Sequence, residues 1–249
     1  MNSLRRDKIL RFIEENSAAT VAQLRELFPD ISVMTIHRDL EFLSKKGAIN
    51  RVRGGARAVA NASEPSFGER VTENSSLKIF MAKKALELIK PKTCIYLDAG
   101  TSCLALAKLL PDIEADIYTI APNIAIELLH LKKPAIHICG GNLNRANLAL
   151  SGQITLNSLN DIHIDIAFIG SGGFSFEKGF TCGKESEALT KALVMKNAGK
   201  TAALTDSSKF GRSLPFYFAD YSNFDYFVSD GELQKDFFQK AAEYSVKII

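Results

Sequence analysis

The sequence has few features of a membrane, secreted or metal-stabilised protein. No apolar run approaches the roughly 18 residues that a membrane-spanning helix needs, and the first residues are followed by mixed polar sequence rather than the apolar core of a signal peptide. The four cysteines are scattered and form no Cys-x-x-Cys pair; they are Cys94, Cys103, Cys139 and Cys182. We therefore expect a cytoplasmic protein with reduced, buried thiols and no contact with a membrane.

Motifs for a nicotinamide dinucleotide or a structural metal are also missing. Gly170, Gly172 and Gly173 do not have the Gly-x-Gly-x-x-Gly spacing, and the acid expected about 20 residues later is absent. His137 and Cys139 share one face of an expected strand, but no second pair with metal-ligand spacing accompanies them. We interpret both as buried core residues and expect neither a cofactor nor a metal.

The composition is that of a globular protein whose positive charge is concentrated at one end. Of the 249 residues, 46% are apolar and 24% are charged, the balance of a protein with a core. Residues 1–57 hold 11 Lys/Arg and 7 Asp/Glu, whereas residues 58–249 hold 20 and 21. This asymmetry favours an N-terminal part that faces nucleic acid, although such an excess also occurs by chance.

Three segments differ in pattern. Residues 1–57 are basic with helical periodicity, and we expect one small domain there. Residues 58–76 are mostly small and polar, so we expect a linker that becomes ordered near Phe67 and Arg70. Residues 77–249 alternate between helix and strand patterns and should form a larger domain.

The alternation in the larger domain predicts a Rossmann-like, mainly parallel α/β sheet. We expect strands at 94–97, 117–120, 135–139, 164–169, 201–205, 226–228 and 246–248. We expect helices at 77–89, up to 110, at 124–131, 186–197 and 233–242. Because ligands of such sheets bind at the carboxyl ends of the strands, the polar loops there are candidate ligand contacts.

The sequence pattern of residues 1–57 predicts three helices followed by a hairpin. Thr20 and Gln23 have the pattern of a capping box that opens the second helix, and Ser32 is placed to cap the third. Gly47 stands where a left-handed helix stop is expected. These signals are typical of a winged helix-turn-helix domain with the helix-turn-helix at about 20–39.

The third helix has the pattern of a recognition helix. Ile36, Leu40 and Leu43 are spaced to face the core, so other residues near its N-terminal end project outward. The N-terminal residues of a recognition helix read base edges. Arg38 can donate two hydrogen bonds to guanine, and Thr35 can contact a phosphate or a thymine methyl.

A basic hairpin tip after this helix can lie against DNA phosphates as a wing. The candidate DNA contacts are Thr20, Ser32, Val33, Met34, Thr35, His37, Arg38, Arg51, Arg53 and Gly54. The alternative is a small helical bundle with a solvated charged face. The sequence of cap, core stripe, outward arginine and basic hairpin favours double-stranded DNA as the partner.

In the larger domain, the residues 98–102 offer a phosphate cradle. Gly100 allows close backbone approach, and Thr101 and Ser102 place hydroxyls beside the free N–H groups of a helix start. An ordinary strand-to-helix turn is the alternative. Loops at 122–123, 140–141 and 206–209 are expected at the same edge of the sheet, where Lys209 offers an ammonium and Asp206 a carboxylate.

The segment from Ser32 to Leu40, with Leu43, Gly47 and Arg51–Ala56, closely resembles the DeoR family of bacterial transcriptional regulators. The family pattern is Ser-x-x-Thr-Ile-Arg-Arg-Asp-Leu, then Leu-x-x-x-Gly and a basic stretch that ends in Gly-Gly-Ala. His37 stands where the family has its first arginine, so the contact made there is expected to differ.

The resemblance covers nearly the whole chain and implies a sensor domain similar to ribose-5-phosphate isomerases and bacterial CoA transferases, which binds phosphorylated sugars. Ala121-Pro122-Asn123 replaces the family's Thr-Asn, which removes one hydroxyl. The effector contacts that this resemblance and the loop positions imply are Lys78, Asp98, Gly100, Thr101, Ser102, Asn123, Gly140, Gly141, Gly170, Glu187, Asp206 and Lys209.

A sugar-phosphate isomerase on the same α/β frame is the alternative function. Aldose–ketose isomerisation needs a carboxylate base. In the isomerases that the fold resembles, paired acids follow the strand equivalent to 164–169, where this chain has Gly170-Ser171-Gly172-Gly173-Phe174. Glu185 and Glu187 remain as bases, but glutamates at a helix start usually complement the helix dipole. We expect no catalysis.

We therefore expect a transcription repressor of a carbohydrate-catabolism operon, released from its operator by a phosphorylated sugar. A palindromic operator would be matched by two helix-turn-helix units, which predicts a homodimer or homotetramer. A purely architectural DNA binder is a third reading, and the polar loops at the strand ends argue against it.

Overall fold

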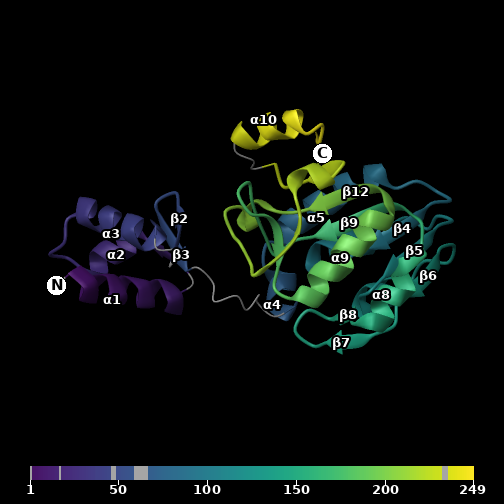
Figure 1. Ribbon diagram of the computed structural model, residues 1–249, viewed down its shortest axis with the longest axis horizontal. Helices are drawn as coiled ribbons and strands as arrows, with labels where there is room; N and C mark the ends of the chain where they lie inside the picture. The colour runs from purple at the N-terminus through teal and green to yellow at the C-terminus, as the bar shows by residue number, and fades with distance from the viewer. Residues whose placement is uncertain (1, 17, 46–48, 59–66, 232–234) are drawn as a thin grey trace. The chain divides into compact units, whose positions relative to one another are not determined.

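The computed structural model describes residues 2–16, 18–45, 49–58, 67–231 and 235–249, and the chain separates into two compact units at Glu64/Pro65 (Figure 1). Each unit is described by itself. Gly47 and the whole segment 59–66 lie outside the described residues. Within the segment 58–76, expected as a linker that becomes ordered near Phe67 and Arg70, residues Phe67–Thr72 form helix α4.

The smaller unit has three helices and a three-stranded antiparallel sheet of order β1-β3-β2. Its elements are α1 (Asn2–Glu15), β1 (Ala18–Thr20), α2 (Val21–Leu27), α3 (Val33–Lys45), β2 (Ile49–Val52) and β3 (Gly55–Ala58). Ile36, Leu40 and Leu43 are 0%, 0% and 5% exposed, as their helical spacing predicts. They pack with Ile9 and Ile13 of α1 into one apolar cluster, so α3 is held by its inner face.

The larger unit is built on a seven-stranded sheet of order β15-β14-β12-β9-β4-β5-β6, in which each neighbouring pair is parallel. Its strands are β4 (Cys94–Leu97), β5 (Asp116–Thr119), β6 (Ala135–Ile138), β9 (Ile164–Gly170), β12 (Ala198–Leu204), β14 (Tyr226–Val228) and β15 (Lys247–Ile248). The expected strands therefore all form, with ends shifted by a few residues. Buried parallel strands are nearly continuous apolar runs, which explains why the sequence shows them so well.

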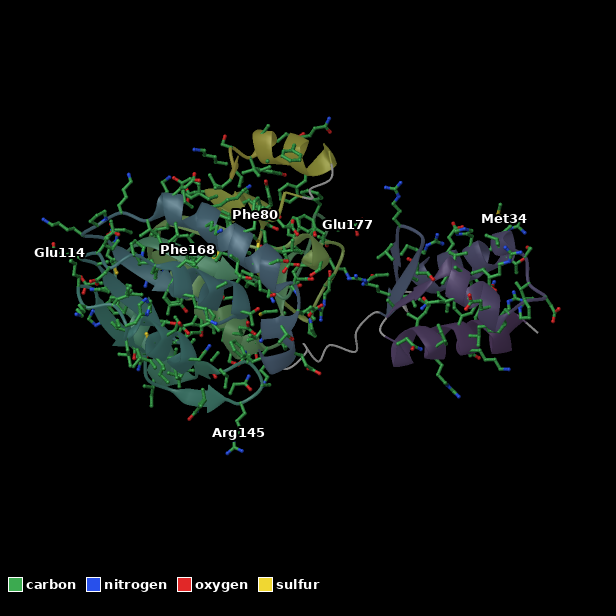
Figure 2. The ribbon with its side chains drawn as sticks, turned by 180° about the vertical axis from the view of Figure 1, so that it is seen from behind. Met34, Phe80, Glu114, Arg145, Phe168 and Glu177 are labelled. Carbon is green, nitrogen blue, oxygen red and sulfur yellow. The ribbon has the colours of Figure 1, made fainter. Side chains whose placement is uncertain are left out.

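Helices cover both faces of this sheet (Figure 1). One face packs on α5 (Ser75–Ala85), α6 (Thr101–Leu109) and α7 (Pro122–Leu128), and the other on α8 (Gln153–Asn160), α9 (Glu185–Asn197) and α10 (Lys235–Glu243). Alternate residues of a strand divide between the two cores, so that Phe168 joins the first core and Ile169 the second. Phe168 lies well inside the unit (Figure 2).

Two small antiparallel sheets were not anticipated from the sequence. A hairpin joins β7 (Asn142–Asn144) to β8 (Ala149–Ser151), and a three-stranded sheet has the order β10-β11-β13. The latter strands are β10 (Gly173–Ser175), β11 (Gly179–Cys182) and β13 (Phe216–Ala219). Single 3-10 turns occur at Leu86–Leu88 (η1), Ser207–Lys209 (η2) and Tyr221–Asn223 (η3). Within the described ranges, no helix combines the length and apolar character needed to cross a membrane.

Candidate DNA interface and candidate effector site

Ser32 caps the recognition-type helix α3. The backbone N–H of Thr35 donates to Ser32 Oγ at 3.3 Å, and the two hydroxyl oxygens lie 2.9 Å apart. The hydroxyl of Thr35 is therefore engaged inside the first turn, which leaves its methyl group for an outside contact. Val33 and Met34 are exposed, with Met34 63% exposed and pointing outward (Figure 2).

The second turn of α3 is anchored by the buried carboxylate of Asp39. Asp39 is 1% exposed and accepts hydrogen bonds from Arg5 Nε at 2.5 Å and Arg6 Nε at 2.8 Å. Burial alone would raise the pKa of the Asp39 carboxyl, but these hydrogen bonds outweigh burial and hold the pKa below its usual range. Arg6 also lies over the Phe42 ring, 3.8 Å from its centroid. These contacts tie α1 to α3 while Arg38 stays exposed on the helix surface.

The hairpin β2–β3 is closed by Arg53 and Gly54. Gly54 has φ +81°, in the region that favours glycine, and Arg51 and Arg53 are exposed. Its neighbour Gly55 is irreplaceable for a different reason, because a Cβ there would lie 2.1 Å from the carbonyl oxygen of Ala19. The hairpin is thereby held against β1 and the start of α2.

Thr20 forms the capping box that its sequence predicts, with Gln23 as the reciprocal partner. Its hydroxyl accepts from the Gln23 N–H at 3.2 Å, and the Thr20 N–H donates to Gln23 Oε1 at 2.9 Å. The carbonyl of Gly54 accepts from Val21 N at 2.8 Å, so the start of α2 and the tip of the wing share a hydrogen bond.

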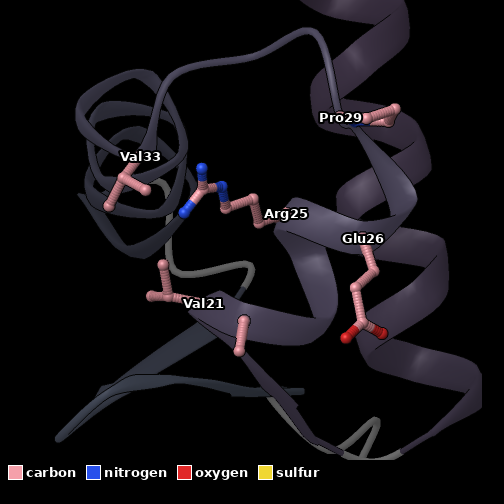
Figure 3. A pocket seen from close by; sticks show the side chains of 6 residues that line it. Val21, Arg25, Glu26, Pro29 and Val33 are labelled. Carbon is pink, nitrogen blue, oxygen red and sulfur yellow. The ribbon is translucent and has the colours of Figure 1, made fainter.

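Arg25 is a candidate contact that the sequence reading missed. It lines a hollow of about 590 Å³ between α2 and the first residue of α3, together with Val21, Ala22, Glu26, Pro29 and Val33. The guanidinium extends toward Val33, whereas the carboxylate of Glu26 points away (Figure 3). The side of the hollow next to the exposed first turn of α3 therefore carries the positive charge of Arg25. Nothing in the sequence distinguishes Arg25 from the other charges of a surface helix.

The loops of the candidate effector site follow adjacent strands. In the order β12-β9-β4-β5-β6, the carboxyl ends lead to Asp206, Gly170, Asp98, Asn123 and Gly140 respectively. Strands lie about 4.8 Å apart, so the two outermost of these loops are separated by roughly 20 Å. The predicted residues thus share one edge of the sheet, and they divide into a centre and two flanks.

A buried ion pair occupies the centre. Asp98 is 0% exposed, and its Oδ2 accepts from the Gly170 N–H at 3.1 Å and from the ammonium of Lys191. Lys191 Nζ also donates to the Gly170 carbonyl at 3.0 Å and lies 3.5 Å from Glu187 Oε1. Asp98, Gly170 and Glu187 were all predicted for this site, whereas Lys191 was not.

Lys191 remains an ammonium despite its burial. Burial alone would lower its pKa, but the carboxylates of Asp98 and Glu187 outweigh burial and raise the pKa above its usual range. From sequence, a lysine four residues after a glutamate in a helix is typical of a solvated i,i+4 pair. The fold instead turns it inward, where it holds Asp98 in place.

Several polar atoms at the centre have no hydrogen-bond partner among the described residues. They are Asp98 Oδ1, both side-chain atoms of Asn123 and the Tyr96 hydroxyl, all inaccessible to solvent. Buried polar groups normally have partners, and leaving one without costs about 1–3 kcal/mol. Asn123 lies in the first turn of α7, which follows β5 after two residues, and α7 packs beside α6. An acceptor–donor set of this kind suits the hydroxyl groups of a ligand.

The start of α6 completes the centre. Gly100 has φ +151°, and a Cβ built on it would meet nothing within 4 Å, so the backbone borders open space. Thr101 is buried and Ser102 is half-buried in the first turn. The free N–H groups of a helix start, beside these hydroxyls, form an arrangement that favours an anion.

Two lysines form the flank at the end of β12. Lys78 is 5% exposed and donates to the carbonyls of Arg70 and Glu73, so it holds the end of α4. Burial, and next the charge of nearby Lys209, lowers the pKa of Lys78. Asp206 is buried and accepts from Ser208 within its own loop. Lys209 is half-buried in the 3-10 turn η2 that follows Asp206.

The glycines of the other flank serve the protein's own packing. Gly141 has φ +141°, and a Cβ there would lie 2.1 Å from Thr155 Oγ1 and 2.8 Å from the Ser151 carbonyl. Gly140 is exposed, and its carbonyl accepts from Thr155 Oγ1 at 2.6 Å. The close approach at Gly141 is therefore to the β7–β8 hairpin and α8, not to a space for a ligand.

Two expectations about core residues were wrong. His137 is half-exposed, where its Nε2 lies 2.9 Å from Asp116 Oδ1 and its ring stacks on Tyr118 at 4.3 Å. Cys94 is half-buried, while the other three thiols are buried. Burial raises the pKa of the Cys94 thiol to about 11, which keeps it protonated. Among the residues that the structure describes, no three metal-binding side chains gather.

Two family models match the chain, and the matched ranges fall in the two compact units. A DeoR-like helix-turn-helix domain matches residues 5–62, and a DeoR C terminal sensor domain matches residues 73–231.

Individual relatives match over nearly their full length. The HTH-type transcriptional regulator GolR of Listeria innocua serovar 6a is 31% identical, over 95% of this chain and 93% of the relative. The HTH-type transcriptional repressor GlcR of Bacillus subtilis is 30% identical, over 89% and 86%. A solved structure of ribose 5-phosphate isomerase A from Methanocaldococcus jannaschii aligns with a TM-score of 0.42 and 19% identity, over 55% of each chain.

Proposed function

Since the chain belongs to the DeoR family of DNA-binding transcriptional regulators, we propose that it represses a carbohydrate-catabolism operon and leaves its operator when a phosphorylated sugar binds. The smaller unit binds operator DNA, and the larger unit is the sensor. Such a protein acts where the chromosome is, in the cytoplasm. It regulates transcription and is not an enzyme, in keeping with the names of its relatives.

The exposed first turn of α3 supports major-groove binding. Val33, Met34 and Arg38 are free of the core, and the wing residues Arg51 and Arg53 are exposed. On this proposal Arg38 reads a base, while Arg25 and Arg53 contact phosphates. Two copies related by two-fold symmetry, in a homodimer or homotetramer, match a palindromic operator.

The unpartnered buried atoms of Asn123 and Asp98 carry the sensor proposal. They lie one strand apart at the sheet edge where α6 begins, next to open space at Gly100. A sugar phosphate supplies what these groups lack: hydroxyls for the amide and the free carboxylate oxygen, and an anion for the start of α6. Lys209 adds a cation at the flank.

The proposal is tested by a thermal-shift screen of the full chain against aldose and ketose phosphates, the same sugars without phosphate, and inorganic phosphate. A sugar phosphate at 100 times its Kd should stabilise the sensor by about 2.7 kcal/mol, and the free sugar should not. The same compound should then weaken binding to a duplex selected from random DNA. Stabilisation without any loss of operator affinity would contradict the proposed induction.

A further inference from the structure

The side chain of Arg51 is exposed to solvent, but its guanidinium lies against the recognition helix. Arg51 belongs to β2, where it pairs with Ala56 of β3. Its Nη1 donates to the backbone carbonyl of His37 at 3.1 Å, and its Nη2 lies 3.2 Å from His37 Nδ1. The wing and α3 are thus joined at the one position where the chain departs from the family's paired arginines.

This contact determines which nitrogen of His37 carries the proton. A guanidinium has only donors, so Nδ1 must accept the hydrogen bond and cannot itself be protonated. The proton of the neutral ring then lies on Nε2. Within the described residues, no partner within hydrogen-bonding distance is present for Nε2, and the ring is half-buried at the helix surface.

His37 shares a helix face with the exposed side chains at the start of α3. Val33 and Met34 precede it by four and three residues, the spacing that places helix side chains side by side. Both are exposed, at 38% and 63%. His37 therefore lies on the same face of α3 as the candidate base contacts.

We propose that His37 and Arg51 form one base-reading unit, in which Arg51 fixes the imidazole tautomer and His37 Nε2–H donates to a guanine in the major groove. Guanine presents two acceptors there, N7 and O6, whereas cytosine presents a donor. This inference rests on the proposed entry of α3 into the major groove. It makes Arg51 a positioning residue and His37 the specificity-determining one.

The alternative is that Arg51 contacts a phosphate by itself and touches His37 only incidentally. A phosphate contact lowers affinity for all sequences alike when it is removed, whereas a tautomer-fixing contact changes the preference at one base pair. The two roles are therefore separated by sequence preference rather than by affinity.

The experiment selects binding sites from random duplex DNA with the full-length protein and its variants. For wild type, we expect a guanine at the position contacted by residue 37, with about three- to tenfold discrimination, as one hydrogen bond provides. H37A and R51A should both lose that preference at the same base pair, and H37A/R51A should lose no more than H37A. R53A, at the exposed wing tip, should weaken binding and keep every preference.

Two further measurements separate positioning from folding. H37Q should keep part of the preference, because a glutamine amide can accept from Arg51 and donate to the base. Nitrogen-15 spectra of the histidine ring should report the Nε2–H tautomer in wild type and a mixture in R51A. A single tautomer in R51A, or loss of preference at different base pairs in H37A and R51A, would overturn the inference. Failure of the wild type to select any duplex would instead refute the proposed function.

Discussion

Lys191 donates a hydrogen bond to Asp98 across 93 residues of sequence, and neither side chain reaches solvent. The carboxylate is thereby held at the end of β4 with one oxygen engaged and the other left without a partner. A residue that the sequence suggests as a ligand contact is therefore also part of the fold's internal framework. Variants of Asp98 itself would confuse the two roles, whereas variants of Lys191 address the framework alone.

Lys191→Met should destabilise the sensor domain strongly. Removing one partner of a buried ion pair leaves the other charge uncompensated, which costs about 3–5 kcal/mol. The measurement is the free energy of unfolding of the sensor transition in urea. Lys200→Met is the matched control, because the Lys200–Asp225 pair at 2.6 Å is solvent-exposed and its loss should leave the transition almost unchanged. Equal effects of the two substitutions would show that the buried Lys191–Asp98 pair contributes no more to stability than the exposed Lys200–Asp225 pair.

Lys209→Ala should give a protein that binds operator DNA normally but responds poorly to inducer. The ammonium is half-buried beside Lys78 and, in our proposal, contacts the phosphate. A charge-assisted hydrogen bond is worth about 1.5–3 kcal/mol, or roughly ten- to a hundredfold in affinity. Calorimetric titration with the sugar phosphate measures this loss. Lys108→Ala removes an equal charge from the exposed side of α6, and its titration should match the wild type.

Asn123→Ala should weaken ligand binding without lowering the stability of the ligand-free protein. Both polar atoms of this amide are buried without partners, so their removal relieves a desolvation cost when no ligand is present. Asn197→Ala is the control, because the Asn197 amide donates to the carbonyls of Leu159 and Asn160 at 2.8 and 2.9 Å. That variant should melt earlier and bind ligand as before. A lower melting temperature in Asn123→Ala would mean that the amide already has a structural role.

Strand positions were predictable because a parallel strand covered on both faces is an apolar run, as at Cys94–Leu97 and Tyr226–Val228. The sheet β10-β11-β13 was not. Its strands begin with glycine or carry little alternation, and β13 lies more than 30 residues along the chain from β11. Pairing over such a separation depends on the buried aromatic cluster around Phe174, which no local pattern reveals.

Convergence of the loops at one sheet edge followed from topology alone, since all parallel strands end on the same side. The roles of individual residues did not. Gly141 leaves room for the close approach of Thr155, and Asp206 accepts a hydrogen bond from the backbone N–H of Ser208. Lys191 is buried in an ion pair with Asp98. Each of these depends on contacts between segments that are distant in sequence, so residue type and loop position predicted the region of the site but not the task of each side chain.

Arg25→Ala and Arg38→Ala should weaken operator binding in different ways. Arg25, in the hollow beside the start of α3, is proposed to neutralise a phosphate, so its loss should reduce the salt dependence of binding by about one counterion for every sequence. Arg38, proposed to read a base, should cost about 1–3 kcal/mol and relax preference at one position. Affinities measured over a series of salt concentrations, with operator and with unrelated DNA, separate the effects. An unchanged footprint and an unchanged base preference in Arg38→Ala would mean that Arg38 does not read a base.

The DNA-binding domain should lose stability as the pH falls below about 4. Arg5 and Arg6 depress the pKa of Asp39 in the folded protein. This carboxylate therefore stabilises the fold at pH values above its unfolded-state pKa of about 3.9, and the stabilisation is lost as the pH falls through the lower folded-state pKa. Because the same contacts join α1 to α3, amide exchange in both helices should accelerate together, beyond the change in intrinsic rate. Asp39→Asn should be less stable at neutral pH and show a flatter dependence in the acid range, because the titrating group is gone. Helices α1 and α3 that remained equally protected at pH 3 and pH 6 would mean that Asp39 does not hold the recognition helix in place.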